Sequence, residues 1–557
     1  SSGDPRPSSA PARCRRSRTR LVNLPDLPPQ RPGDAIAAAI AAIEGHIADS
    51  DWKAAAALAA IKPVIESGIA FVRDLPHLNL YSGLALACKM IGRQGDSRNH
   101  AARALITDPA DLLGHALLPR PELIHVGRQL VHYQQFDVAK RIFDAALSIS
   151  ANEEYAFYAD IFDYQKSLKA EAKQVKVSAN SGRPTILNIV IWGDAFVAKF
   201  LRYTLPSLLA AQNLPALAAS GDVTFDIHST QADIAVLRQS CVVQAAERFA
   251  TFTYTEIPER SLRFKRSEST PDPDRLCVSG AQYATAIKAR HSGADLSFID
   301  CGGLYANGFL RGAKHHLEDG YKAVAVMSPR ASGRNVDAFV QDKKDRFAIE
   351  VDTAALVAYA TGNLNKQLLN SFMRPNGPPV YQDPLAALFK IPAGFIVHSF
   401  QFDMAMIAND FLPDDLAFDF HTADGRFLAE LCDGRDPGPL IKVIANPDRE
   451  FAVINLDSGE DGTERAFAEF PVTPESCAES ALKWCAKKTD LSYFDWAFRQ
   501  RFEFPMDDAM AVLPGGGMAG DETVERILGE FAAGRDRVDR CIDFLNGDFI
   551  TTTVDLV

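Results

Sequence analysis

Polar residues and glycines follow four predicted strands, at the points where a ligand could bind. The first run, "ILNIVIWG" (186–193), is almost continuously apolar, as is typical of a buried parallel strand. In an open α/β sheet, ligands bind at the carboxyl ends of the strands, near the switch in strand order. The residues at these ends are Trp192, Gly193 and Asp194; His228, Ser229 and Thr230; Asp300, Cys301, Gly302 and Gly303; and Ser328, Pro329 and Arg330.

Alternating strands and helices must position these residues. Strands are predicted at 186–193, 223–230, 250–257, 295–300 and 320–330, with helices between them. Asp194 is expected to cap the first of these helices. Units of this length indicate a right-handed, mostly parallel sheet. After "PNGPP" the sequence becomes strand-rich again. Helix is predicted through 335–373 and again through 477–504, followed by a closing helix.

A helical region precedes the sheet. In "QQFDVAKRIFDAALSIS" (134–150), Phe136, Ala139 and Phe143 begin a small/large pattern typical of a tetratricopeptide (TPR) repeat. Segments 95–109 and 51–65 are weaker copies, and a plain helical bundle is the alternative. The predicted domains are a disordered tail at 1–34, a TPR-like helical domain at 35–176, an α/β half at 186–334, a second α/β half at 335–510 and a C-terminal helical segment at 521–557.

Composition excludes several classes of protein. The net charge of −12 argues against a broad nucleic-acid surface, and no apolar run reaches the length of a transmembrane segment. Nine scattered cysteines without a C-x-x-C pair favour reduced thiols. The N-terminal tail lacks the apolar core of a secretory signal. We therefore expect a cytoplasmic protein.

The stretches "IVIWGDAFVAKFLRYTLPSLLAAQNLPALA", "FDIHST" and "FIDCGGLYANGFLRGAKHHLEDGYKAVAV" resemble bacterial GT-A-type glycosyltransferases. "VHSFQFD" and "FHTADGRFL" are similar to stretches of the same group. The likeness covers about residues 186–460. It implies a GT-A-like fold with a nucleotide-sugar-binding half at 186–334 and an acceptor-side half at 335–510. A TPR-like module ahead of it fits enzymes that modify a glycan or a protein, and it offers a surface for a protein partner.

The resemblance also implies functional residues. Asp300 stands where the first acid of an Asp-x-Asp motif would stand, and Gly302 replaces the second. Two acids at that spacing hold Mg²⁺ or Mn²⁺ against the donor diphosphate, so a weakly held ion is expected here, with Asp300 and His398 as ligands. Arg330 and Arg334 could pair with phosphate. The expected nucleotide-sugar-binding residues are Trp192, Gly193, Asp194, Thr230, Asp300, Gly302, Asn307 and Arg330.

An inverting transfer needs a carboxylate or histidine near the acceptor hydroxyl. Asp403 is the favoured base, ahead of Asp424 and Asp419. Three alternatives stay open. His398 could be an ordinary strand histidine, and Trp192 a core anchor. The chain could also be a TPR-like interaction protein with a degenerate, non-catalytic transferase domain. A methyltransferase fits less well, because the first strand lacks the usual glycine-rich loop.

Overall fold

The computed structural model describes residues 80–90, 94–132, 135–174, 182–262, 273–365, 385–416, 425–457, 473–485, 490–506 and 521–534, with a few single residues between these ranges. The predicted tail at 1–34, the weak repeat at 51–65 and the candidate bases Asp419 and Asp424 lie outside the described residues. The chain divides into two compact units, residues 1–104 and 105–557.

Helices account for the described residues before the sheet. They are α3 (Leu80–Met90), α4 (Gln94–Thr107), α5 (Leu112–Leu117), α6 (Arg120–His132), α7 (Phe136–Ile149) and α8 (Glu153–Ala172). The predicted apolar face of α7 is buried, with Phe143 wholly enclosed and its ring against Tyr158 and Phe162 of α8. Gly127 of α6 lets the Phe143 ring approach, since a Cβ there would lie 2.3 Å from it. The predicted helix is confirmed.

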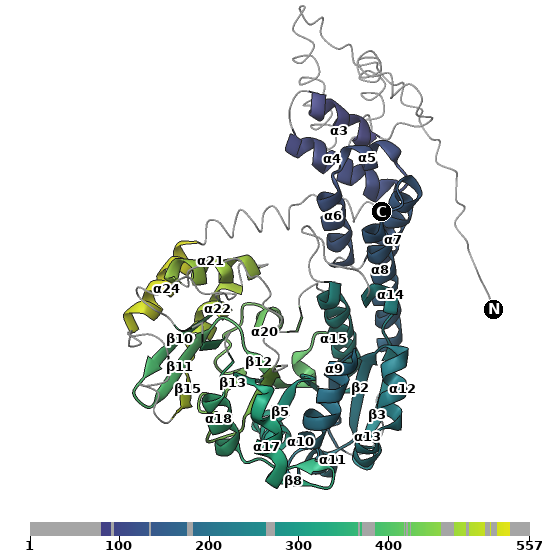
Figure 1. The fold of residues 1–557 in the computed structure, drawn as a ribbon. Helices are drawn as coiled ribbons and strands as arrows, with labels where there is room; N and C mark the ends of the chain where they lie inside the picture. The colour runs from purple at the N-terminus through teal and green to yellow at the C-terminus, as the bar shows by residue number, and fades with distance from the viewer. Residues whose placement is uncertain are drawn as a thin grey trace, which may run out of the picture. The chain divides into compact units, whose positions relative to one another are not determined.

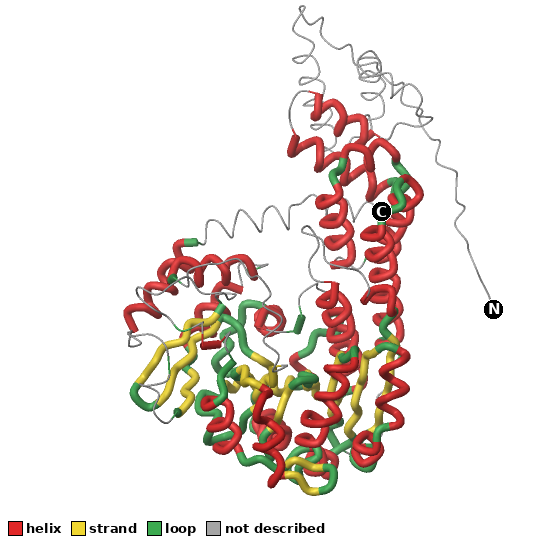
Figure 2. Tube along the Cα trace, in the orientation of Figure 1, coloured by secondary structure: helices red, strands yellow, loops and turns green. Residues whose placement is uncertain are grey.

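A seven-stranded sheet forms the centre of the second unit (Figure 2). Its strands, in spatial order, are β13 (Ile441–Val443), β6 (Ala323–Val326), β12 (Asp403–Ile407), β4 (Asp295–Phe298), β1 (Thr185–Val190), β2 (Val223–Ser229) and β3 (Thr251–Glu256). All neighbours are parallel except β12, which runs antiparallel to both β4 and β6. The mostly parallel α/β sheet predicted from the sequence is therefore confirmed. Strands from both predicted halves, before and after residue 335, build it.

Helices connect and cover these strands. After β1 come α9 (Asp194–Lys199), a π-helical turn (Phe200–Thr204), α10 (Leu205–Leu208) and α11 (Leu214–Ser220). After β2 come α12 (Gln231–Gln239) and α13 (Cys241–Ala246). The long helix α15 (Pro273–Ser292), preceded by α14 (Glu259–Leu262), packs on β1 and β4, and α8 lies along α15 (Figure 1). Helix α16 (Phe309–Glu318) packs against β12 and β6.

Three smaller sheets accompany the seven-stranded sheet within the described residues. One has the order β5-β14-β7 and contains β5 (Gly303–Tyr305), β14 (Val453–Asp457) and β7 (Arg330–Ser332). Another contains β10 (Ala386–Ile391), β11 (Gly394–Ser399) and β15 (Phe502–Pro505), all antiparallel. The third is the two-residue hairpin of β8 (Lys344–Asp345) and β9 (Ala348–Ile349). Further α-helices among the described residues are α17 (Val336–Val340), α18 (Thr353–Gly362), α20 (Gly425–Cys432), α21 (Pro474–Trp484), α22 (Asp490–Arg499) and α24 (Asp521–Ala533).

Two of the predicted helical stretches are wrong in part. Within 335–373, the β8–β9 hairpin interrupts the helix, and Arg346 in its two-residue turn takes a positive φ of 50°. At the end of 477–504, the residues of β15 form a strand. Phe502 and Phe504 alternate there and bury their rings, a period of two that suits a strand better than a helix.

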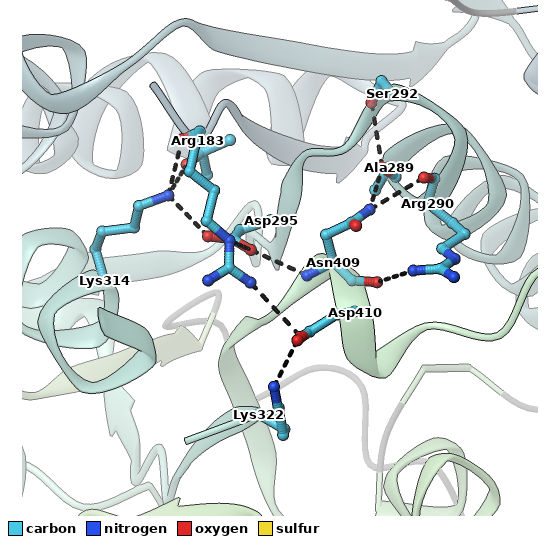
Figure 3. A network of polar contacts seen from close by, with 10 residues as sticks. Arg183, Ala289, Arg290, Ser292, Asp295, Lys314, Lys322, Asn409 and Asp410 are labelled. Atoms are coloured by element: carbon cyan, nitrogen blue, oxygen red, sulfur yellow. Dashed lines mark hydrogen bonds and ion pairs between the residues drawn. The ribbon is translucent and has the colours of Figure 1, made fainter. Parts of the chain in front are cut away.

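A polar network centred on a buried acid ties the sheet together at the edge opposite the strand ends discussed above (Figure 3). Asp295, the first residue of β4, is wholly buried and pairs with Lys314 Nζ at 2.7 Å and Arg183 Nε at 2.8 Å. It also accepts the backbone N–H of Asn409. Through Arg183, the network continues to Asp410 and Lys322. These contacts join the starts of β1, β4 and β6 to the end of β12.

None of the helices that the structure describes combines the length and apolar character needed to cross a bilayer.

Candidate functional site

The antiparallel strand β12 brings an acid to the carboxyl edge of the parallel strands. Asp403 is the first residue of β12 and lies opposite Val326, the last residue of β6. Because β12 runs against its neighbours, its start lies where β4 and β6 end. Asp300, after β4, and Arg330, after β6, are at the same edge. The structure therefore brings together Asp300, Asp403 and Arg330, which the sequence had placed on separate segments.

The turn after β4 is built around Asp300. Its Oδ1 accepts the backbone N–H of Gly302 at 2.7 Å, and its own N–H donates to the hydroxyl of Tyr305 at 2.9 Å. Gly303 must be a glycine, since a Cβ there would lie 2.7 Å from the Tyr305 ring. At Gly302 a Cβ would meet only ordinary contacts, 3.4 Å from Asp300 Oδ1 and from the carbonyl oxygen of Leu456. The turn is thus rigid, with space at position 302.

Asp403 reaches solvent on one side, but protein atoms surround its carboxylate on the others, and it accepts the backbone N–H of Ser328 at 3.1 Å. Desolvation by the surrounding protein raises the pKa of Asp403, and the negative charge of Asp300 raises this pKa further. The Ser328 hydrogen bond and the charge of Arg330 oppose the rise. Asp300 follows β4 and Arg330 follows β6, the two strands that flank Asp403 in the sheet. A carboxyl with a raised pKa at a strand end is suited to proton transfer.

The turns after β1 and β2 are joined by a residue that the sequence reasoning missed. Asp233, in the first turn of α12, accepts the N–H of Gly193 at 2.9 Å and the hydroxyl of Thr230 at 2.7 Å. Thr230 caps α12 as its hydroxyl accepts the Asp233 N–H. Trp192 is half-buried beside this joint. Three of the predicted nucleotide-binding residues therefore lie at one joint between two turns. The sequence gave no sign of this joint, because Gly193 and Asp233 are 40 residues apart.

Asp194 is not the cap of α9, contrary to the prediction. Gly193 occupies the N-cap position with φ 83° and ψ 143°, and Asp194 is the first helical residue. The positive φ turns the chain sharply into the helix, which glycine allows without steric cost. Asp194 is exposed in the first turn, where its negative charge suits the helix dipole.

A π-helical turn presents two further residues to the Asp300 turn. Pro206 has no N–H, and just before it the N–H of Leu205 bonds to the carbonyl oxygen of Phe200, five residues back. Short π-helical segments within α-helices occur often at functional sites. Thr204, in this turn, donates to the carbonyl oxygens of Cys301 at 3.0 Å and Gly303 at 2.7 Å. Lys199, just before the turn, donates to the carbonyl oxygen of Leu456 at 3.2 Å.

Two other predicted site residues make contacts that are structural. Asn307 Oδ1 accepts the backbone N–H of Gln212, which holds the loop between α10 and α11. His398 lies in β11 of the β10-β11-β15 sheet and is 7% exposed. Its Nδ1 is 2.9 Å from the carbonyl oxygen of Phe498, and its ring packs against Phe389 and Phe498. These contacts are those of a core histidine, the alternative that the sequence left open.

His228, at the end of β2, belongs to a buried network. Asp226 accepts hydrogen bonds from Thr253 at 2.8 Å, Thr285 at 2.7 Å and Lys288 at 2.8 Å, and lies 3.4 Å from His228 Nε2. Burial alone would raise the pKa of Asp226, but the hydrogen bonds and charges of His228 and Lys288 hold this pKa well below its usual range. The network joins β2 and β3 to α15 and stabilises the sheet beneath the site.

The residues around Asp300 fit a divalent ion in part. Within the described part of the chain, no group of three or more His, Cys, Asp or Glu side chains is arranged to hold a metal. Asp300 and Asp403 supply two carboxylates, each of which already accepts one backbone N–H. Mg²⁺ commonly binds through one or two carboxylates together with substrate phosphate oxygens. Asp300 would hold such an ion together with phosphate oxygens, while His398 lies in a different sheet.

Comparisons with known proteins assign no family or function to the chain. No protein-family model matches the chain, and no curated protein matches it either.

Proposed function

We propose that this protein is a glycosyltransferase that moves a sugar from a nucleotide-sugar donor to a glycan or protein acceptor. One observation carries the proposal. Two carboxylates, Asp300 and Asp403, and one guanidinium, Arg330, meet at the carboxyl edge of a mostly parallel sheet. The order of the strands reverses between β1 and β4, and Asp300 follows β4. Ligands of open α/β sheets bind at such a switch point.

The donor would lie across the ends of β1, β2 and β4. The joined turns of Gly193, Thr230 and Asp233 offer a fixed backbone surface for the nucleoside, with Trp192 beside them as a stacking partner. The diphosphate would lie over Asp300 and Gly302, toward Arg330, whose planar guanidinium pairs well with phosphate oxygens. Asp194, in the first turn of α9 next to Gly193, borders this region.

A divalent ion, Mg²⁺ or Mn²⁺, held by Asp300 and by phosphate oxygens of the donor would neutralise the departing diphosphate, and Asp403 would stay free of the ion. Arg330 supplies part of the positive charge that the diphosphate needs. Its charge already opposes the rise in the pKa of Asp403. The protein's own contribution is the rigid turn: Gly302 N–H and Tyr305 hold both sides of Asp300 in place.

Asp403 is the proposed base. It reaches solvent on one side at the edge, and its Oδ2 is fixed by the Ser328 N–H. A base that accepts the proton of an acceptor hydroxyl works best when its pKa lies near the working pH. Desolvation and the nearby Asp300 charge move the pKa of Asp403 in that direction. The TPR-like helices would then present a glycan or protein acceptor, or bind a protein partner.

The test separates binding from chemistry. Thermal stabilisation by a panel of uridine, guanosine and cytidine diphosphate-sugars is measured with Mn²⁺ and with EDTA. We expect one donor to stabilise the wild type, and Asp300→Asn to abolish the shift. Asp144→Asn, at an exposed helix position, is the matched control and should keep it.

Turnover is measured next, as release of the nucleoside diphosphate from the donor that binds. Asp403→Asn should keep donor binding and slow release by about 10²–10⁴-fold, the usual contribution of a general base. Binding without any turnover in the wild type would favour the interaction protein with a non-catalytic domain. A flat response across the whole panel would refute the donor site.

A further inference from the structure

Lys199 is a half-buried cation beside the Asp300 turn. It is the last residue of α9, and the π-helical turn begins at the next residue. Its ammonium donates to the carbonyl oxygen of Leu456 at 3.2 Å and lies 5.7 Å from the centre of the Phe196 ring. Within the described residues no carboxylate pairs with it. An ammonium has three N–H donors, and a partly desolvated charge is stabilised by an anionic partner.

The Leu456 carbonyl oxygen places Lys199 next to position 302. The same oxygen that accepts the Lys199 ammonium lies 3.4 Å from where a Cβ of residue 302 would be. The N–H of Leu456 in turn donates to the carbonyl oxygen of Gly302. Lys199 and the missing side chain of residue 302 are thus neighbours across one carbonyl oxygen. In an Asp-x-Asp motif a second carboxylate would occupy this space.

Strand β14 connects this cation to the rest of the site. Asn455 lies opposite both Gly303 of β5 and Arg330 of β7, so β14 runs between the Asp300 turn and Arg330. The charge of Lys199 also acts on Cys301, in the middle of the turn, where it opposes the rise in the thiol pKa caused by burial. Two positive charges, Lys199 and Arg330, therefore border the turn from different strands and helices.

We infer that Lys199 binds the diphosphate of the donor, in the space that Gly302 leaves open beside Asp300. This inference rests on the proposed function and adds a residue to its donor site. Phosphate oxygens are strong acceptors that suit the N–H donors that the Lys199 ammonium keeps beyond its bond to Leu456. A glycine at position 302 then has a physical reason: a carboxylate there would pair with Lys199 and repel the diphosphate. Lys199 would share the neutralising role with any divalent ion.

The experiment is isothermal titration of the full chain with uridine, guanosine and cytidine diphosphates and with inorganic pyrophosphate, in EDTA and in Mn²⁺. Lys199→Met keeps the unbranched side chain, one atom shorter, and removes its charge. We expect it to weaken the tightest of these probes by about tenfold or more in both conditions, the usual effect of losing one charge-assisted hydrogen bond. Lys140→Met, at an exposed position of α7, is the control for the lost charge and should bind as the wild type does.

A second variant tests the pairing directly. Gly302→Asp fits the available space, so we expect it to fold and to weaken binding in EDTA, because the new carboxylate engages Lys199. Equal affinity of Lys199→Met and the wild type would overturn the inference while leaving the proposed function in place. Failure of the wild type to bind any nucleoside diphosphate would overturn both. Folding of each variant is checked by its unfolding midpoint without ligand.

Discussion

Replacing Lys314 with methionine should destabilise the sheet strongly, although Lys314 lies far from the proposed chemistry. The Lys314 side chain is 6% exposed, and its ammonium donates to Asp295 at 2.7 Å, the carbonyl oxygen of Arg183 at 3.0 Å and Thr185 at 3.2 Å (Figure 3). Lys314→Met removes the charge and leaves Asp295 buried. Breaking a buried ion pair by removing one partner typically costs about 3–5 kcal/mol.

The remaining partners of Asp295 decide where in this range the result falls. After Lys314→Met, Asp295 still pairs with Arg183 Nε at 2.8 Å and accepts the Asn409 N–H at 3.0 Å. The loss should therefore lie near the lower end, about 3 kcal/mol. Asp295→Ala removes the only carboxylate that pairs with Lys314 among the described residues, so its loss should lie near about 5 kcal/mol.

The assay is urea unfolding monitored by tryptophan fluorescence. The midpoint and the slope of the transition are compared between variants. The double variant Lys314→Met/Asp295→Ala should lose less than the sum of the two single losses, because each single variant leaves one charge uncompensated. Lys140→Met breaks the exposed pair with Asp144 and should cost less than about 1 kcal/mol. If Lys314→Met costs no more than Lys140→Met, the reasoning about burial is refuted.

Three further predictions concern single positions. Asp403→Asn should raise the free energy of unfolding at pH 7. The pKa of Asp403 is raised in the folded state, so its ionised carboxylate destabilises the fold at pH values above that pKa. The gain in stability of the Asn variant should vanish below about pH 4, where the carboxyl is protonated in both states, and urea unfolding at several pH values measures it. Gly193→Ala forces a side chain into a positive φ and should cost about 1–3 kcal/mol and weaken donor binding, whereas Gly362→Ala, which meets no atom within 4 Å, should change neither in calorimetry. Gly127→Ala places a methyl 2.3 Å from the Phe143 ring and should lower stability by about 1–3 kcal/mol; an unchanged melting temperature would contradict the packing described.

The sequence alone determined the elements whose residues carry a local signal. The apolar run of β1 and the small/large face of α7 were predicted because burial repeats with a fixed period along one strand or helix. The parallel sheet followed from the alternation of such elements. Likewise, the polar ends of β1, β2 and β4 could be identified, because each lies directly after its own strand. The hairpin of β8 and β9 was missed, because strands of two residues are too short to show an alternation of buried and exposed side chains.

Only the tertiary structure decided which of these residues meet. Asp403 reaches Asp300 because β12 enters the sheet antiparallel between β4 and β6, and strand direction leaves no mark on the sequence of a single strand. Lys199 reaches position 302 through the carbonyl oxygen of Leu456 in β14, which lies 257 residues further along the chain. His398 was a candidate ligand because its residue type can bind a metal. Whether it lies in a binding site depends on contacts between distant segments, and the packing buries it in β11 instead.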